Sequence, residues 1–564
     1  MKLILSQYLR TLRERDEFDR LLPDLLLVMG YVPLFKPQVG VRQYGVDLAA
    51  IGTADDGVQE LLLLVIKRGD IDRATWDTGI QAVRPSLNEV LDVYLRTHVQ
   101  PIHEQLRKKI VLAATGDMKQ EVQANWDGYC SENATKATFE FWGGDHIASL
   151  IEQYMLNENI FGSEARGDLR KSIALAAEID YDQRDLHRLF RRILALDKEG
   201  GLFDATKSSR DLVKALQNVN LTAQIYTRWA EDEKNLKQGL IASERAMLWS
   251  WHRIQLEDSK NRPRYYEKFS ELWRSYTQAA HRYFDKLQHH FYVRDGLSGY
   301  CRENAEFALV VFEQIGLIAT IGLSQILIAT DQDGLKFNLD NANVIADGLA
   351  RLIANNPVSG SPRLDGNAID VTLGLLLLTA TDHMDQARDW LEQLVTRADY
   401  TFKLKRNFPI DSDSVDDLAE ATVFDDEALR SQLMRTSWFL ATLAGWTVIL
   451  ERADLYEVLA KNTKNDYPEV CLQLWHHAKD VPRHLYYWPA QYRCGEAEAP
   501  IVLPDTIDEY RERMKAVLAS ARHDIRTFSP ACLVGMDAID LVASRHFRTP
   551  VAPFFWYRLL PKIV

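Results

Sequence analysis

The sequence has few cysteines, and their spacing does not suit a disulfide framework or a zinc site. Its 564 residues contain Cys130, Cys301, Cys471, Cys494 and Cys532, with no CxxC pair among them. Disulfide-rich secreted domains and zinc ribbons both need closely spaced cysteines. The N-terminal apolar run is also too short for an export signal. We therefore expect a protein of the reducing cytoplasm.

Motifs of several enzyme classes are absent as well. The sequence contains no GxxxxGK[ST] loop, GxSxG turn, HExxH pair or glycine-rich dinucleotide turn, which argues against the usual P-loop, α/β-hydrolase, zinc-protease and dinucleotide-binding sites. The pairs His289-His290 and His476-His477 have no further ligand at metal-binding spacing, and adjacent helical residues point apart. If ATP drives this system, another subunit has to bind it.

Positive charge is scarcer than negative charge. The chain has 67 Lys and Arg residues against 80 Asp and Glu residues, a formal net charge of -13. Any contact with nucleic acid must therefore come from a local patch, because a broadly basic surface is excluded. Three basic segments qualify, at residues 10–15, 67–73 and 107–109, although each is equally compatible with a solvated surface.

Only one apolar run is long enough to span a membrane, at residues 307–329. Glu313, Gln314 and Gln325 interrupt it, which favours a buried helix or helical pair over a membrane segment. With 46% hydrophobic and 26% charged residues, the composition is that of a soluble globular protein. We expect no membrane contact, and membrane association is kept as a minor alternative.

The first 160 residues combine strand and helix patterns. Strand patterns occur at residues 31–35, 41–51, 60–67, 109–114 and 137–142, with hairpin turn residues at 53–57. Helical patterns occur at residues 16–30, 74–96 (with a break near Pro85), 118–130 and 145–154. The run at 61–66 is apolar throughout, as in a central strand covered on both faces. These patterns predict a three-layer α/β domain with a mixed central sheet, over residues 1–160.

The remainder of the chain is predominantly helical in pattern. Residues 157–167 have the composition of a linker, and residues 168–480 follow as a large all-α region. A solenoid-like array is one arrangement open to this region, although no fixed repeat is found. Residues 481–564 are expected to form a C-terminal helical tail, with its aromatic residues packed on the preceding domain.

The residues with the clearest chemical meaning lie at the ends of two neighbouring strands. Gly45-Val46 leads to Asp47, and Lys67 ends the strand at 60–67. An acid and a lysine brought together in this way are the minimal equipment of a metal-dependent phosphodiesterase. Side chains alternate along a strand, so residues 65 and 67 point to the same face.

This order of elements resembles the core of the PD-(D/E)XK nuclease superfamily, most closely the Mrr-like restriction endonucleases. The segments that carry the resemblance are residues 18–21, 27–31, 45–47, 65–68 and 110–154. The resemblance covers about residues 1–160. It implies a restriction-endonuclease-like fold, Mg²⁺ or Mn²⁺ as cofactor, DNA as substrate with RNA not excluded, and a homo-oligomer.

The resemblance also implies roles for particular residues. Asp47 would be the main metal ligand, the carbonyl of Ile66 a second ligand, and Lys67 the group that positions water and stabilises developing negative charge. The residues implied for nucleic-acid contact are Arg42, Arg68 and Arg73.

The chain departs from the family at Val65, where relatives have Glu, Asp or Gln. Valine offers no ligand, so two interpretations stay open. Asp19 on the first helix, with an amide from Gln81, could complete the site. Alternatively, Asp47 and Lys67 form a partly buried ion pair in an inactive nuclease fold.

Two functions follow from these interpretations. The first is a DNA-cleaving effector of a bacterial restriction or antiphage defence system, restrained by a helical region that binds a trigger or a protein partner. The second is a catalytically inactive scaffold that binds nucleic acid or protein. The defence role rests on analogy in domain plan.

Overall fold

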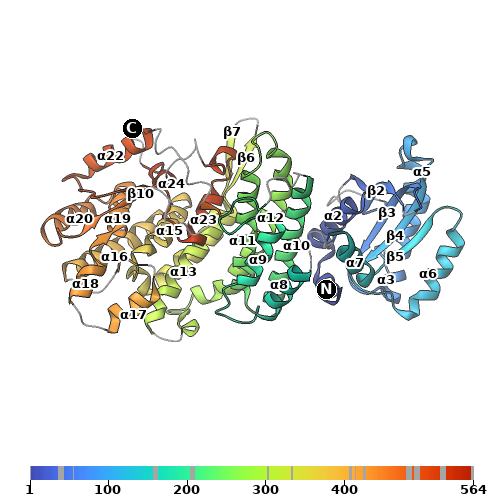
Figure 1. Cartoon of the computed structure of the whole chain (residues 1–564), viewed down its shortest axis with the longest axis horizontal. Helices are drawn as coiled ribbons and strands as arrows, with labels where there is room; N and C mark the ends of the chain where they lie inside the picture. The colour runs from blue at the N-terminus through green and yellow to red at the C-terminus, as the bar shows by residue number, and fades with distance from the viewer. Residues whose placement is uncertain are drawn as a thin grey trace. The chain divides into compact units, whose positions relative to one another are not determined.

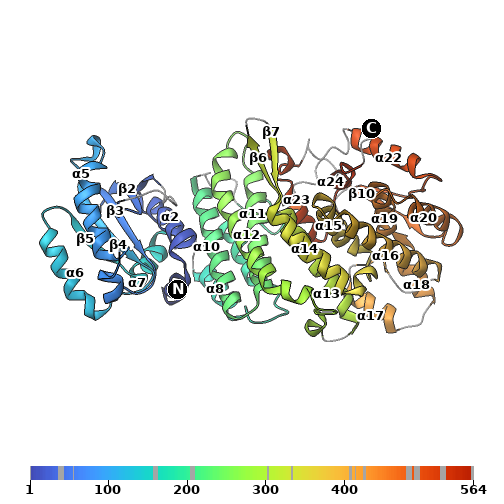
Figure 2. The same ribbon diagram turned by 180° about the vertical axis from the view of Figure 1, so that it is seen from behind.

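The chain divides into two compact units. The computed structural model describes residues 2–35, 44–54, 56–79, 81–155, 163–203, 210–301, 304–331, 334–404, 409–412, 414–423, 427–477, 485–487, 496–520 and 529–560. Unit 1 comprises Met1–Ala195 and Asp204–Lys234, and unit 2 comprises Leu196–Phe203 and Asn235–Val564. Figures 1 and 2 show the elements of both units in chain order from blue to red.

Unit 1 is built on a mixed five-stranded sheet, as the sequence predicts. The strands lie in the order of the chain: β1 (Val32–Phe35), β2 (Leu48–Thr53), β3 (Gln59–Lys67), β4 (Arg107–Ala114) and β5 (Thr138–Trp142). Pairs β1–β2 and β2–β3 are antiparallel, whereas β3–β4 and β4–β5 are parallel. The carboxyl ends of β3, β4 and β5 therefore meet at one edge of the sheet.

Strand β3 is the centre of the core. Its six residues from Leu61 to Ile66 are at most 2% exposed, which explains the unbroken apolar run. Leu61, Leu63 and Val65 belong to a cluster that also contains residues of the helices after β3, such as Trp76 and Leu87. Burial on both faces accounts for the absence of polar alternation.

The helices of unit 1 fill the intervals between the strands and continue beyond β5. They are α1 (Lys2–Thr11), the π-helical turn η1 (Glu14–Phe18), α2 (Asp19–Met29), α3 (Arg73–Asp77), α4 (Val83–Glu89), the π-helical turn η2 (Val90–Tyr94), α5 (Leu95–Thr97), the short turn η3 (Pro101–His103), α6 (Gln120–Asn133), α7 (Gly144–Leu150), the π-helical turn η4 (Ile151–Met155), α8 (Ser163–Ala174), α9 (Arg184–Ile193) and α10 (Arg210–Asp232).

Two sequence predictions need correction here. The helical stretch expected at 74–96 breaks near Pro85, as predicted, but the break lies before this residue, between α3 and α4. Pro85 itself is in the first turn of α4, where proline removes no intrahelical hydrogen bond. Residues 163–167, expected to be linker, are the start of α8, whose buried side includes Ala165 and Leu169.

Helices α8, α9 and α10 lie in unit 1, so the compact unit extends past the change of composition near residue 160. Helix α10 packs near α1. The Tyr8 hydroxyl donates to Gln224 Oε1 at 2.7 Å, and Arg228 Nη2 donates to the Thr11 carbonyl at 3.3 Å. These bonds link the first helix of the chain to the last helix of unit 1.

Unit 2 is largely helical. Its helices and helical turns are α11 (Leu236–Gln255), α12 (Pro263–Phe291), η5 (Ser298–Tyr300), α13 (Asn304–Leu323), α14 (Asp340–Asn355), η6 (Pro357–Gly360), η7 (Asp365–Asn367), α15 (Ala368–Ala380), α16 (Met384–Lys403), α17 (Val415–Val423), α18 (Glu427–Leu433), α19 (Trp438–Ile449), α20 (Ala453–Asn465), α22 (Ile507–Ala519), η9 (Cys532–Val534), α23 (Ala538–Phe547) and α24 (Pro553–Tyr557). Short two-stranded pairs are formed by β6 (Leu327–Asp331) with β7 (Gly334–Asn338), β8 (Thr436–Ser437) with β9 (Cys471–Leu472), and β10 (Leu474–His476) with β11 (Glu496–Glu498).

Helix α13 is the centre of unit 2 and covers most of the apolar run at 307–329. It packs against α12, α14, α15 and α23. By length and composition it is the one described helix that could cross a membrane, and 72% of its apolar window is buried within the protein. This burial supports the expectation of a core helix. Contact with α23, more than two hundred residues later, is unlike a solenoid, in which each repeat contacts its neighbours.

A buried charged cluster joins α23 to α11. Glu244 is fully buried, and its Oε2 accepts from Arg545 and lies 2.9 Å from Nδ1 of His546. Burial lowers the pKa of His546 well below its usual value. The packed aromatic tail expected from the sequence is also present, since the residues of α24 are buried.

Candidate functional site

The approach to Asp47 depends on a glycine. Gly45 has a φ of +81°, and a Cβ at this position would lie 2.2 Å from the Ser86 carbonyl oxygen of α4. Both the backbone conformation and the close approach therefore exclude a side chain here. The turn brings Asp47 to the start of β2, beside the carboxyl end of β3.

Both the backbone and the side chain of Asp47 form hydrogen bonds to β3 at the end of the β2–β3 pairing. Its backbone N–H donates to the Leu64 carbonyl at 2.9 Å, and its Oδ2 accepts from the Ile66 N–H at 2.7 Å. The N–H and C=O of a residue in an antiparallel pair face the same neighbour. Because the Ile66 N–H points to Asp47, we expect the Ile66 carbonyl to lie on the same side of β3.

Several charges act on the Asp47 carboxyl group. Burial raises its pKa to about 6, against the hydrogen bond from Ile66 and the positive charge of Lys67, which lower it. The negative charges of Glu14 and Asp19 raise it further. Three carboxyl groups and one ammonium group therefore interact at the carboxyl end of β3, an excess of negative charge suited to a divalent cation.

Lys67 reaches this edge without an ion pair to Asp47. Its side chain is half-buried at the last position of β3, and no contact within 4 Å joins it to Asp47 in the described part of the chain. The ion pair proposed for an inactive fold is therefore not formed. Lys67 affects the Asp47 carboxyl group over a longer range.

Glu14 is the site residue that sequence reasoning missed. It lies on η1, and its Oε2 accepts from the backbone N–H of Arg68 at 3.2 Å. A π-helical turn is rare and is often found at functional sites. No helical periodicity indicates it, because α1 ends at Thr11 and Arg13, in an extended conformation, separates α1 from η1.

Val65 is buried in the apolar core, and its exposed fraction is 0%. It packs in the cluster that contains Trp76, Val83 and Leu87 from the helices after β3. A carboxylate at this position would have to replace apolar contacts. The structure gives position 65 a packing role and places the acidic groups of the edge on η1, on α2 and before β2.

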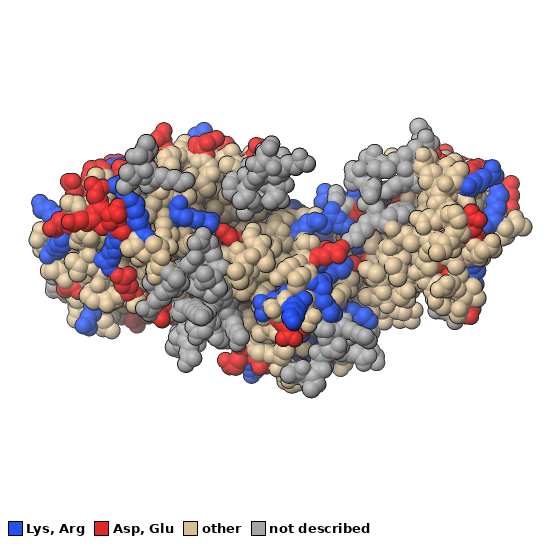
Figure 3. All heavy atoms as spheres, turned by 90° about the horizontal axis from the view of Figure 1, so that it is seen from above, with Lys and Arg blue, Asp and Glu red and all other residues tan. Residues whose placement is uncertain are grey.

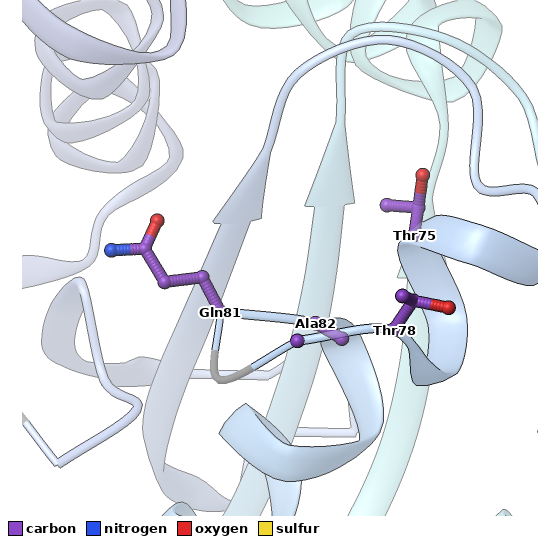
Figure 4. A pocket seen from close by; sticks show the side chains of 5 residues that line it. Thr75, Thr78, Gln81 and Ala82 are labelled. Carbon is purple, nitrogen blue, oxygen red and sulfur yellow. The ribbon is translucent and has the colours of Figure 1, made fainter.

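Gln81 lines a surface hollow instead of joining Asp47 and Lys67. The hollow has a volume of about 720 Å³ and is lined by Thr75, Thr78, Gly79, Gln81 and Ala82. Figure 4 shows the Gln81 amide extending to one side of it and the two threonine hydroxyls lying on the other. Within the described residues, Gln81 makes no hydrogen bond to Asp47 or Lys67.

Two of the three arginines predicted to contact nucleic acid lie in the described part of the chain. Arg68 and Arg73 are both exposed, directly after β3 and at the first residue of α3. The backbone N–H of Arg73 donates to Glu121 Oε1 at 3.3 Å. Arg42 lies outside the described residues.

Across the described ranges, no group of three or more His, Cys, Asp or Glu side chains is close enough together to hold a metal ion. Glu14, Asp19 and Asp47 share an electrostatic environment but do not form a compact ligand set in this conformation. The donor chemistry suits Mg²⁺ or Mn²⁺, and a bound cation would have to draw the carboxylates together.

No family model matches the chain, and neither a curated protein nor a solved structure is significantly similar to it.

Proposed function

We propose that unit 1 is a metal-dependent nuclease that cleaves DNA, and that unit 2 regulates it as the sensing part of a bacterial restriction or antiphage effector. The supporting observation is the meeting of Asp47 and Lys67 at the carboxyl end of β3, with Glu14 and Asp19 acting on the same carboxyl group. The observed order of elements also agrees with the nuclease core expected from the sequence.

In this proposal each group has a defined task. Asp47 and the Ile66 carbonyl would hold Mg²⁺, with Glu14 or Asp19 replacing the acid that Val65 cannot supply. The ion would neutralise charge on the phosphate and lower the pKa of a bound water. Lys67 would orient the water or donate a hydrogen bond to the oxygen on which negative charge develops.

Arg68 and Arg73 would contact phosphates of the DNA backbone, where arginine forms strong, charge-assisted hydrogen bonds. Gln81 is the weakest member of the proposed set, since its amide would act only from the surface hollow.

The test is divalent-dependent cleavage of supercoiled plasmid by the full chain. Asp47→Asn and Lys67→Met should each reduce the initial rate in Mg²⁺ or Mn²⁺ at least ~100-fold, and EDTA should abolish it. The matched control is Lys171→Met, on the exposed side of α8, which should retain the wild-type rate. Equal cleavage by wild type and both site variants would reject the proposed site.

A second candidate, an inactive scaffold, is favoured by the hydrogen bond from Ile66 to Asp47, which gives Asp47 a structural task at the end of the ladder. This candidate predicts DNA or protein binding without cleavage in any divalent cation, unchanged by Lys67→Met. Binding and cleavage measured on the same preparations separate the two candidates.

A further inference from the structure

The loops that follow β3 and β4 are joined into one rigid platform, which we call the edge platform and define as residues 67–71 and 115–119. Six hydrogen bonds cross between them: Thr115 N to the Lys67 carbonyl (3.3 Å), Gly69 N to Thr115 Oγ1 (2.7 Å), Gly116 N to the Gly69 carbonyl (3.1 Å), Ile71 N to the Asp117 carbonyl (2.9 Å), Lys119 N to the Ile71 carbonyl (3.0 Å) and Asp117 N to Asp70 Oδ1 (2.8 Å).

Packing reinforces these bonds. A Cβ at Gly116 would lie 2.3 Å from Asp70 Oδ1 and 2.6 Å from the Gly69 carbonyl carbon, so the two loops touch with no room for a side chain. Groups on the edge platform are therefore held at fixed positions relative to Lys67.

Two cations lie over the edge platform. Lys119 Nζ is 2.6 Å from Asp70 Oδ2, and Arg10 Nη2 is 2.6 Å from Asp117 Oδ2. The Lys119 and Arg10 side chains are 52% and 57% exposed. Each cation is thus placed by a carboxylate and still reaches solvent.

Arg10 lies over the edge platform because the N-terminal segment runs across the carboxyl ends of the parallel strands. Every fourth residue of this segment contacts the chain after a different strand. Ser6 donates to Asp145 Oδ1, after β5, at 2.7 Å. Arg10 contacts Asp117, after β4, and Glu14 contacts Arg68, after β3. Position along this segment therefore corresponds to position along the sheet edge.

The ion pair between Arg10 and Asp117 is not needed to hold α1 in place. Leu5 and Leu9 are fully buried and Tyr8 is almost so, whereas an exposed ion pair contributes only about 0–1 kcal/mol. An exposed cation with so weak a partner can exchange it for a phosphate at little cost. Arginine is especially suited to this because its planar fork matches phosphate oxygens.

We propose that Arg10 and Lys119 bind the phosphate adjacent to the scissile one, so that the DNA strand runs over the edge platform from Lys67 toward the end of β4. This placement rests on the proposed function, which puts the scissile phosphate at Lys67. Figure 3 shows basic and acidic side chains interspersed on one face of the protein.

The experiment measures binding of a short fluorescent DNA duplex to the full chain by anisotropy, in EDTA and again in Ca²⁺, over a series of salt concentrations. Arg10→Gln and Lys119→Gln should each reduce the salt slope by ~0.9, which corresponds to ~8-fold weaker binding at 0.1 M salt. Arg96→Gln is the matched control, because Arg96 forms an exposed ion pair with Asp92 on another part of unit 1.

Asp117→Asn separates binding from a structural role. It breaks the same ion pair as Arg10→Gln but leaves the guanidinium free for phosphate, so binding should be equal to or tighter than that of wild type. Equal weakening by Arg10→Gln and Asp117→Asn would overturn the proposal, as would wild-type salt slopes for Arg10→Gln and Lys119→Gln or no DNA binding in either buffer. Thermal unfolding of each variant checks that it folds.

Failure of the proposed function has a different signature. If the wild-type chain binds DNA with slopes that depend on Arg10 and Lys119 but never cleaves plasmid in Mg²⁺ or Mn²⁺, the catalytic proposal fails and the phosphate contact stands.

Discussion

Val65 occupies the position at which the proposed metal site would need an acid. Its side chain is fully buried among Trp76, Val83 and Leu87, so valine is favoured here by packing. An ionised carboxylate at this depth would lose its hydration in a cluster made almost entirely of apolar side chains. The position at which the resemblance predicts an acid is therefore committed to the core in this chain.

Val65→Glu is predicted to destabilise unit 1 by about 3 kcal/mol or more, because it buries a charge in an apolar cluster. Thermal unfolding and hydrogen exchange of the β3 amides measure the effect. Val58→Glu is the control, since Val58 is 47% exposed near the same hairpin and should tolerate the change. Full stability together with faster cleavage in Val65→Glu would show that position 65 opens onto the metal site.

Asp47 gives unit 1 a specific pH dependence. The pKa of its carboxyl group is raised to about 6, compared with about 3.9 in an unfolded chain. Between these values the folded state binds more protons than the unfolded state, so this group's contribution to the free energy of unfolding decreases as pH rises through the window. Above pH 6 the desolvated carboxylate is a net cost.

Asp47→Asn is therefore predicted to stabilise unit 1 at pH 7.5 by roughly 2 kcal/mol, because an amide can still accept from Ile66 and is never charged. Hydrogen exchange of the β3 amides at pH 4.5 and 7.5 measures this, with Asp127→Asn on the exposed side of α6 as control. An identical pH profile for wild type and Asp47→Asn would contradict the assignment. Greater stability with lost cleavage is typical of a residue retained for function.

At the scale of elements, we propose that η1 supplies the acid that β3 lacks. The turn is one π-helical step between α1 and α2, and it carries Glu14 to the backbone N–H of Arg68. Because Glu14 also raises the pKa of Asp47, the two carboxyl groups interact directly through their charges. An acid supplied by a helix and one supplied by a strand would then share the cation.

Glu14→Gln is predicted to slow Mg²⁺-dependent cleavage to the level of Asp47→Asn and to lower the pKa of Asp47, because one neighbouring negative charge is removed. Initial rates of plasmid nicking and Mn²⁺ titration by calorimetry provide the readouts. Glu17→Gln is the matched control: Glu17 belongs to the same turn but pairs with Arg13. Equal rates for Glu14→Gln and Glu17→Gln would assign the metal-binding role to Asp19 instead.

Elements whose bounds depend on neighbouring residues could be predicted from the sequence. Strand β3, the turn before it and the end of α2 at Gly30 follow from short-range patterns and were predicted nearly to the residue. Strand β2 was predicted at 41–51 but begins only at Leu48, because residues 44–47 form the turn that contains Gly45. Glu14 could not be found in this way, because its role depends on a hydrogen bond to Arg68, 54 residues later. The break near Pro85 was predicted, although it precedes the proline, which the first turn of α4 accommodates.

At the scale of the molecule, the boundary of unit 1 decides how the proposed nuclease can be studied alone. A cut at residue 160, where the composition changes, would remove α8, α9 and α10. It would leave Tyr8 without Gln224 and the end of α1 without Arg228. A cut after Lys234 keeps these contacts, although residues 196–203 of unit 2 then remain as a surface segment.

We predict that residues 1–234 unfold cooperatively and that residues 1–160 are less stable by about 3 kcal/mol, the cost of exposing one or two large apolar side chains. For a unit of this size the difference corresponds to a midpoint lower by roughly 6–12 °C. In the full chain, Tyr8→Phe combined with Arg228→Ala should lower the protection of α1 amides in the same direction, which shows that the α1–α10 contact is responsible. Equal midpoints for the two fragments would place α8–α10 outside the folding unit, and the edge platform would then owe its stability to the sheet alone.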